Sequence, residues 1–205
     1  MEIKENFLVT SAPYLKELYK CMTDSFNDLN GISSEETIGY EIRTKSDIVR
    51  DNYLRHVKNN LPNIEIREID KNCKVIVLKC NVDSNNIYFL KVKKMTKEFY
   101  AEGNKTNSVK KFCTQQLSIE GNGFIKPIGI YIGYIPDPYF KSFNLYFVQP
   151  KNLFSYSWKE NFNDLIAGNV NTEQTELFSD RKSIIKPKFL PLKQNINLKN
   201  VNQKD

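Results

Sequence analysis

The chain has 205 residues, of which 40% are hydrophobic, and a formal net charge of +6 at pH 7. This length and apolar content suit a single domain with a substantial core, and no apolar run approaches the length of about 20 residues that spans a bilayer. Composition therefore argues against a membrane-spanning protein. Basic residues outnumber acidic ones in residues 41–119 and 179–205, which favours either a negatively charged partner or a solvated basic surface.

Two amphipathic helices are expected in the first 60 residues. The Ser11-Ala12-Pro13 run is a start signal, and apolar residues follow it at 3.6-residue spacing until Asn30-Gly31. The second helix is expected from Ser46, acting as the N-cap, to Asn60, because Pro62 then stops it. The first helix and the second should each bury one face.

Three strand-like runs come next, at Ile64–Ile69, Cys73–Cys80 and Ile87–Lys94. Their connectors are short and rich in turn-forming residues, so we expect an antiparallel meander. A third helix is predicted over Asn107–Leu117. Two runs of β-branched and aromatic residues, at 127–137 and 143–150, then predict a pair of neighbouring strands in a buried sheet.

The C-terminal part contains a predicted short helix, Trp158 to Ile166, with Gly168 as its stop. From residue 169 onward no hydrophobic period is sustained, and residues 169–205 are expected to be an extended or disordered basic tail. The overall prediction is an α+β fold: one domain over residues 1–168, with a mostly antiparallel sheet of about five strands covered by three to four helices, and an extended C-terminal arm.

Cysteine usage and the N-terminus bear on the compartment. The four cysteines are scattered without a CxxC pair, and the first residues lack the basic and apolar regions of a signal peptide. We therefore expect a cytoplasmic protein. No metal-ligand cluster and no cofactor motif is found in the sequence. The only histidine, His56, is interpreted as a partly exposed helix residue, although a cysteine could meet it in space as a nucleophilic pair.

Lysines gather near the end of the third predicted strand. Lys91 and Lys93 share one strand face with Phe89, and Lys94 and Lys97 follow them. This strip could bind a phosphate backbone, or it could be a solvated, lysine-blunted sheet edge. On the polar side of the second helix, Arg50 and Arg55 are further candidate partner-binding residues, and Asp51 is expected to pair with Arg55 one turn later. Asp137, between two prolines, is interpreted as a fixed turn.

The order of helix, three-strand meander, helix and strand resembles the core of the PD-(D/E)xK nuclease superfamily. That resemblance implies two carboxylates holding Mg²⁺ and a lysine that activates water. Here Asp83 and Lys93 would be the alternative nuclease site. The full motif is absent, because Lys91-Val92-Lys93 stands where the family has D/E-x-K. Catalysis by this scheme is therefore less favoured than binding.

A second resemblance covers about residues 40–166. The stretch Tyr40–Ile48, the run Gly133-Tyr134 through Pro150, and Trp158 are similar to an uncharacterised group of proteins carried by Firmicutes and their phages. It implies a mobile-element setting and a role in phage–host conflict. Our leading hypothesis is a non-enzymatic binding protein that acts through a protein or nucleic-acid partner. A divergent metal-dependent nuclease and an antitoxin-like inhibitor protein are the alternatives.

Overall fold

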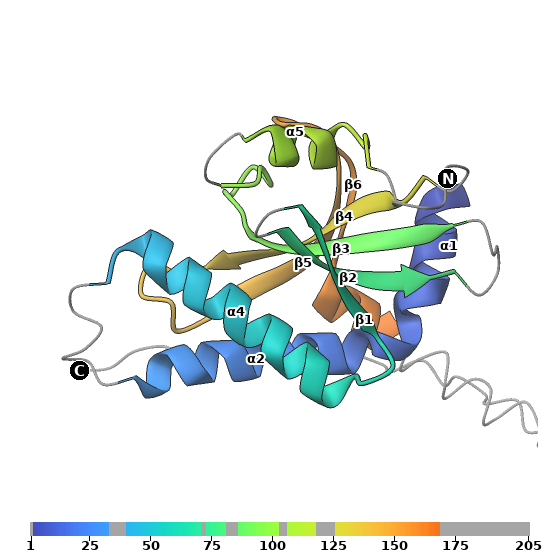
Figure 1. The fold of residues 1–205 in the computed structure, drawn as a ribbon. Helices are drawn as coiled ribbons and strands as arrows, with labels where there is room; N and C mark the ends of the chain where they lie inside the picture. The colour runs from blue at the N-terminus through green and yellow to red at the C-terminus, as the bar shows by residue number, and fades with distance from the viewer. Residues whose placement is uncertain are drawn as a thin grey trace, which may run out of the picture.

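The computed structural model describes residues 2–32, 40–70, 73–80, 86–102, 106–117 and 126–168. Its elements follow one another as α1 (Glu2–Ser11), η1 (Ala12–Tyr14), α2 (Leu15–Gly31), α4 (Ile42–Asn60), β1 (Glu65–Asp70), β2 (Cys73–Lys79), β3 (Ile87–Lys94), α5 (Asn107–Cys113), β4 (Ile128–Pro136), β5 (Phe143–Asn152) and β6 (Ser155–Asn161). A last helical segment covers residues 162–168. The described chain is an α+β domain built on one sheet (Figure 1).

The six strands lie in the sheet in their chain order, from β1 to β6. Neighbouring strands are antiparallel except β3 and β4, which run parallel with Leu90 opposite Ile130. A parallel neighbour requires a long crossover, and the segment that carries α5 supplies it. Because β3 and β4 run in the same direction, their last residues lie together at one edge of the sheet.

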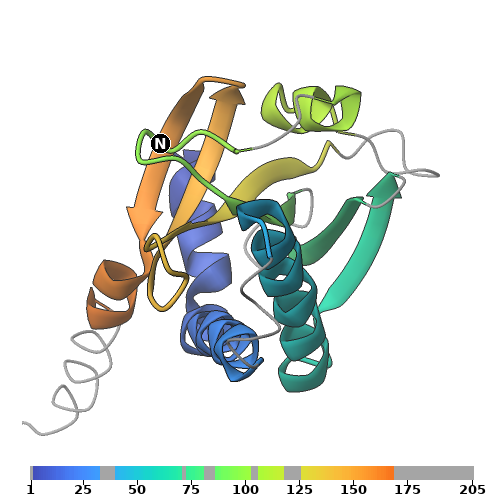
Figure 2. The ribbon, with the colours of Figure 1, turned by 90° about the vertical axis from the view of Figure 1, so that its left-hand side faces the viewer.

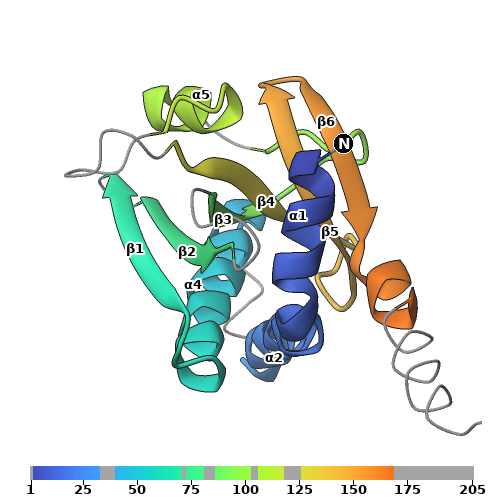
Figure 3. The same cartoon turned by 90° about the vertical axis from the view of Figure 1, so that its right-hand side faces the viewer.

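Helices cover both faces of the sheet. Phe7 of α1, Met22 of α2 and Tyr53 of α4 belong to the larger core cluster on one face. Phe112 of α5 packs with Phe89 of β3 in a smaller cluster on the other face. Figures 1 and 3 show α5 on one side of the strands and α2 and α4 on the other. The sheet is therefore the middle layer, with the larger core under α1, α2 and α4.

The predicted meander and the predicted pair of neighbouring strands are both confirmed, and the structure shows that the pair, 128–136 with 143–152, is antiparallel. The expectation of about five strands is close, and the sixth is β6. The short helix predicted from Trp158 to Ile166 is present over residues 162–168, but its predicted start is wrong, because Trp158 lies on β6. Helix α4 begins at Ile42, before Ser46, whose hydroxyl donates to the Ile42 carbonyl oxygen inside the helix instead of capping it.

Two further differences concern helices. The sequence prediction missed α1, whose exposed Val9 and Ile3 obscure the apolar stripe around the fully buried Phe7. Helix α5 ends at Cys113, earlier than predicted, and Thr106 caps it by accepting a hydrogen bond from the Val109 N–H. The tail expected over 169–205 lies outside the described residues.

The candidate phosphate-binding pocket

A pocket with a volume of about 860 Å³ lies at the end of β3, between that strand, the first half of α4 and the start of α5. We call it the β3 pocket. Six basic and three acidic side chains line it: Arg43, Arg50, Lys74, Lys91, Lys93 and Lys94 against Asp47, Asp51 and Glu102. Its formal charge is therefore positive, which favours an anionic ligand.

Both sides of β3 contribute lysines to the pocket, because the pocket wraps around the end of the strand. Lys91 lies toward α5, with its Nζ 5.6 Å from the centre of the Phe112 ring. Lys94 points to the other face, where its Nζ is 5.8 Å from the centre of the Phe140 ring. The alternation of strand side chains thus places charges on two walls of one pocket.

All three pocket carboxylates already have a basic partner within the pocket. Arg50 makes ion pairs with Asp47 at 2.9 Å and with Asp51 at 3.0 Å. Lys94 pairs with Glu102 at 2.8 Å. These acids neutralise Arg50 and Lys94, so the unneutralised positive charge rests on the other lining cations.

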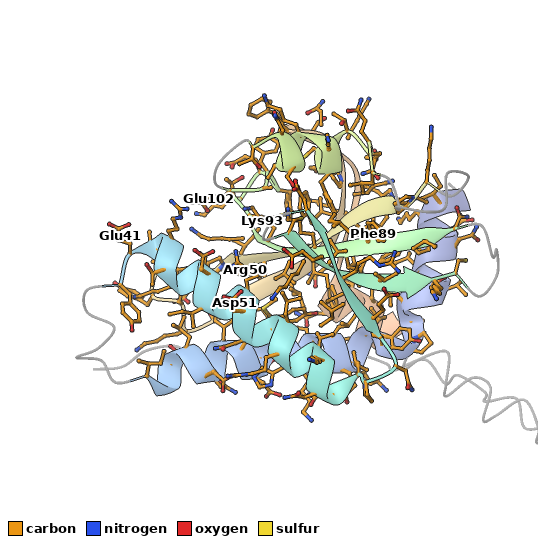
Figure 4. All side chains as sticks on the ribbon, in the orientation of Figure 1. Glu41, Arg50, Asp51, Phe89, Lys93 and Glu102 are labelled. Atoms are coloured by element: carbon orange, nitrogen blue, oxygen red, sulfur yellow. The ribbon has the colours of Figure 1, made fainter. Side chains whose placement is uncertain are left out.

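Lys93 has no hydrogen-bond or ion-pair partner among the residues that the structure describes, although it is half-buried. Burial lowers the pKa of its ammonium group, and the positive charges of Lys91 and Arg50 lower it further, which together outweigh the opposite effect of the Asp47 carboxylate. Figure 4 shows Arg50 on α4 and Glu102 on the segment after β3 on either side of Lys93. A half-buried cation that makes no ion pair and lies close to other cations is costly, and an incoming anion would relieve that cost.

The structure brings together four of the six predicted binding residues. Lys91, Lys93, Lys94 and Arg50 line the β3 pocket, whereas Lys97 and Arg55 do not. Lys97 is exposed in the turn that follows Met95. Arg55 instead makes an ion pair with Asp28 of α2 at 2.8 Å, so the predicted pair with Asp51 is wrong.

The aromatic part of the predicted strip is also corrected. Phe89 shares the α5 face of β3 with Lys91, as predicted, but its ring is fully buried in the smaller core cluster. Figure 4 places it farther along the strand, away from Lys93. A buried ring cannot stack on a ligand, so Phe89 has a structural role.

Sequence reasoning missed Arg43, Lys74, Asp47 and Glu102 as pocket residues. The position of Lys74 could have been inferred from the sequence, because the predicted antiparallel pairing of β2 and β3 places the start of β2 beside the end of β3. Arg43 lay in the segment before the predicted helix start at Ser46, and no pattern tied it to β3. Glu102 joins the pocket because residues 95–102 fold back on themselves, with a bridge between Met95 and Ala101.

Of the alternative nuclease site, only Lys93 can be placed. Asp83 lies outside the described residues. The described residues that flank it are joined by a hydrogen bond from the Cys80 N–H to the Asn86 carbonyl oxygen at 3.0 Å. That bond is at the start of β3, whereas Lys93 is at the end of the strand.

His56 is engaged by a carboxylate. Its Nε2 lies 2.6 Å from Oδ2 of Asp28, and the side chain is 20% exposed, in keeping with a partly exposed helix residue. All four cysteines are free and buried. Burial raises the pKa of Cys21 to about 11 and also raises that of Cys113, which makes these two thiols poor nucleophiles.

Within the described ranges, no cluster of three or more histidine, cysteine or acidic side chains is arranged to hold a metal ion. None of the helices in that part of the chain has both the length and the apolar character needed to cross a bilayer. Comparison with known proteins gave no significant match to a protein-family model, to a curated protein or to a solved structure.

Proposed function

We propose that this protein binds nucleic acid, and that it does so by taking a backbone phosphate into the β3 pocket beside Lys93. The observation that carries the proposal is the state of Lys93: half-buried, close to the cations Lys91 and Arg50, and without an ion pair in the described chain, although the nearby charge of Asp47 offsets part of the repulsion. A phosphate would supply the missing negative charge. Lysine and arginine contacts to phosphates position a nucleic acid without reading its sequence.

The neighbouring residues suit this role. Lys91 is fixed by its contacts with Cys73 and Phe112, so little side-chain entropy is lost when it meets a phosphate. Arg43 and Lys74 line the same pocket. Asp47 and Asp51 hold Arg50 in place through two ion pairs, so its guanidinium group is already oriented.

The experiment is a binding titration of the full chain with labelled nucleic acid, comparing the wild type with Lys93→Met. Methionine keeps most of the side-chain volume and removes the charge. Lys97→Met is the matched control, because Lys97 is an exposed lysine four positions away that does not line the pocket. The proposal predicts that only Lys93→Met weakens binding, by about tenfold as for a charge-assisted contact. Equal affinities of all three proteins would refute it.

The divergent nuclease is the second candidate, and one observation favours it. Three carboxylates, Asp47, Asp51 and Glu102, line the same pocket as Lys93, and carboxylates with a lysine are the residue types that such nucleases use. Against it, each of these acids is paired with a cation and Lys91 stands in place of a motif carboxylate.

Incubation of DNA and RNA substrates with the protein and Mg²⁺ or Mn²⁺ separates the two candidates. The binding function predicts no cleavage. Turnover that is lost in Lys93→Ala or Asp83→Ala, while the variants remain folded, would establish the nuclease instead.

A further inference from the structure

One aromatic side chain, Tyr139, stands out on the surface. It lies in the loop between β4 and β5 and is 75% exposed, the largest fraction among the exposed large hydrophobic residues of the described chain. An isolated exposed aromatic residue needs no explanation in itself. Its loop, however, is held in a fixed shape next to the β3 pocket.

The carboxylate of Asp137 holds the loop together. It accepts hydrogen bonds from the backbone N–H groups of Tyr139 at 3.3 Å, Lys141 at 2.6 Å and Ser142 at 2.8 Å. The Asp137 N–H in turn donates to the Ser142 carbonyl oxygen at 2.9 Å. The backbone of Tyr139 is therefore ordered before any ligand arrives, which lowers the entropy lost on binding.

The next residue anchors the loop to the core. The Phe140 side chain is 3% exposed and its backbone has a positive φ of 57°, which turns its ring inward while Tyr139 stays outside. The Phe140 carbonyl oxygen accepts a hydrogen bond from Asn30 of α2 at 3.2 Å. This arrangement displays Tyr139 on a rigid support.

The loop borders the β3 pocket. The Phe140 ring lies under Lys94, which lines the pocket. Figures 1 and 2 show the β4–β5 loop and the first turn of α4 on the same side of the molecule. That first turn carries Ile42, a pocket residue that is 58% exposed. The loop that displays Tyr139 thus adjoins the wall of the pocket that Lys94 forms, and the exposed Ile42 lines the pocket itself.

From this arrangement we infer that the nucleic acid bound at the β3 pocket is single-stranded, and that an unpaired base stacks on Tyr139 while a phosphate reaches Lys93. The inference rests on the proposed function of the same pocket. A strand with free bases offers an aromatic face to Tyr139, and base stacking on aromatic side chains together with a basic groove is how single strands are bound without sequence preference. A duplex keeps its base faces covered and offers only its backbone.

The test is fluorescence anisotropy of the full-length protein with a labelled single strand of about 12 nucleotides and with the matching duplex. The inference predicts tighter binding of the single strand. Tyr139→Ala should weaken single-strand binding by about fivefold or more, because it removes a stacking contact. Tyr139→Phe should retain the wild-type affinity, since the ring remains.

Phe154→Ala is the control, because Phe154 is 56% exposed and lies beyond the other end of β5. It should bind the single strand as the wild type does. Equal or tighter binding of the duplex, or an unchanged affinity of Tyr139→Ala, would overturn the inference while Lys93-dependent binding would still support the proposed function. Failure to bind either nucleic acid would overturn both.

Discussion

The Lys91 ammonium group donates a hydrogen bond to the Cys73 thiol, with 3.1 Å between Nζ and Sγ. This contact crosses from β3 to the start of β2 and holds Lys91 close to Lys93 on the wall of the β3 pocket. Two like charges thus share a half-buried site, and the second of them, Lys93, makes no ion pair in the described chain. The thiol orients Lys91 without neutralising it, so both lysines keep their positive charge for an anion.

The first prediction is that Lys93→Met stabilises the protein while it weakens binding. In the absence of ligand the buried charge is unfavourable, so its removal should increase the free energy of unfolding by about 1 kcal/mol at neutral pH. Chemical denaturation of the wild type, Lys93→Met and the control Lys97→Met measures this directly. A destabilised Lys93→Met protein would contradict the picture of an uncompensated charge.

The second prediction is that the difference in stability between Lys93→Met and the wild type depends on pH. Because the pKa of Lys93 is lowered in the folded protein from its ordinary value of 10.5, the unfolded chain binds more protons in the interval between the two pKa values. The loss of stability caused by the charged Lys93 is therefore fully present below the pKa that Lys93 has in the folded protein. It disappears as the pH rises toward 10.5. The advantage of Lys93→Met over the wild type should shrink across that interval. A constant difference would show that Lys93 titrates normally.

The third prediction concerns the Asp137 loop. Burial alone would raise the pKa of this carboxyl group, but the hydrogen bonds from Ser142, Lys141 and Tyr139 outweigh it, so the pKa is lowered below its ordinary value of 3.8. Asp137→Ala should lower stability at neutral pH by about 0.5 kcal/mol, less than for a buried group because solvent screens the exposed carboxylate. That cost is fully present above pH 3.8 and disappears as the pH falls through the lowered pKa.

Thermal unfolding of Asp137→Ala and of the wild type between neutral and acidic pH checks this. Glu98→Ala is the control, since Glu98 is an exposed acid in a turn. Asp137→Ala should also weaken single-strand binding, because Tyr139 loses its support. If Asp137→Ala is as stable as the wild type at neutral pH, the hydrogen bonds of Asp137 contribute little to the stability of the protein.

The fourth prediction concerns Gly133, which lies opposite Tyr146 in the β4–β5 pair. A Cβ atom added there would be 2.5 Å from Sδ of Met95, and Met95 is 2% exposed. Gly133→Ala must displace this buried side chain, at a cost of about 1 to 3 kcal/mol. Gly31→Ala is the control, because nothing lies within 4 Å of its added Cβ. Equal melting temperatures for Gly133→Ala and the wild type would show that Met95 moves freely.

The strands were predictable from the sequence because β-branched and aromatic residues mark them and short polar connectors separate them. That the runs 127–137 and 143–150 are neighbours followed as well, whereas their register, with Gly133 beside Tyr146, comes from the structure. Trp158 was misplaced because the predicted helix began too early: Tyr156 and Trp158 alternate with the exposed Ser157 and Lys159, as on a strand, and the helix begins only after β6 ends at Asn161.

The candidate site was only partly predictable, for a physical reason. Lys91, Lys93 and Lys94 are close in sequence, so their strand could be recognised. The other walls come from α4, β2 and the segment after β3, and only the three-dimensional fold shows that Arg50 belongs to the pocket and Arg55 does not. The two arginines lie on one helix, but Arg55 is drawn to Asp28 on α2. Sequence spacing gives the face of a helix, and tertiary contacts determine what that face meets.

If Lys93 binds a phosphate of a nucleic acid, as we propose, its contribution should be visible in the salt dependence of binding. Each phosphate neutralised by a protein cation contributes about 0.7 to 0.9 to the slope of log K against log salt concentration. The slope measured with Lys93→Met should therefore be smaller than that of the wild type by about this amount, while Lys97→Met leaves the slope unchanged. Identical slopes and affinities for the wild type and Lys93→Met would contradict the claim.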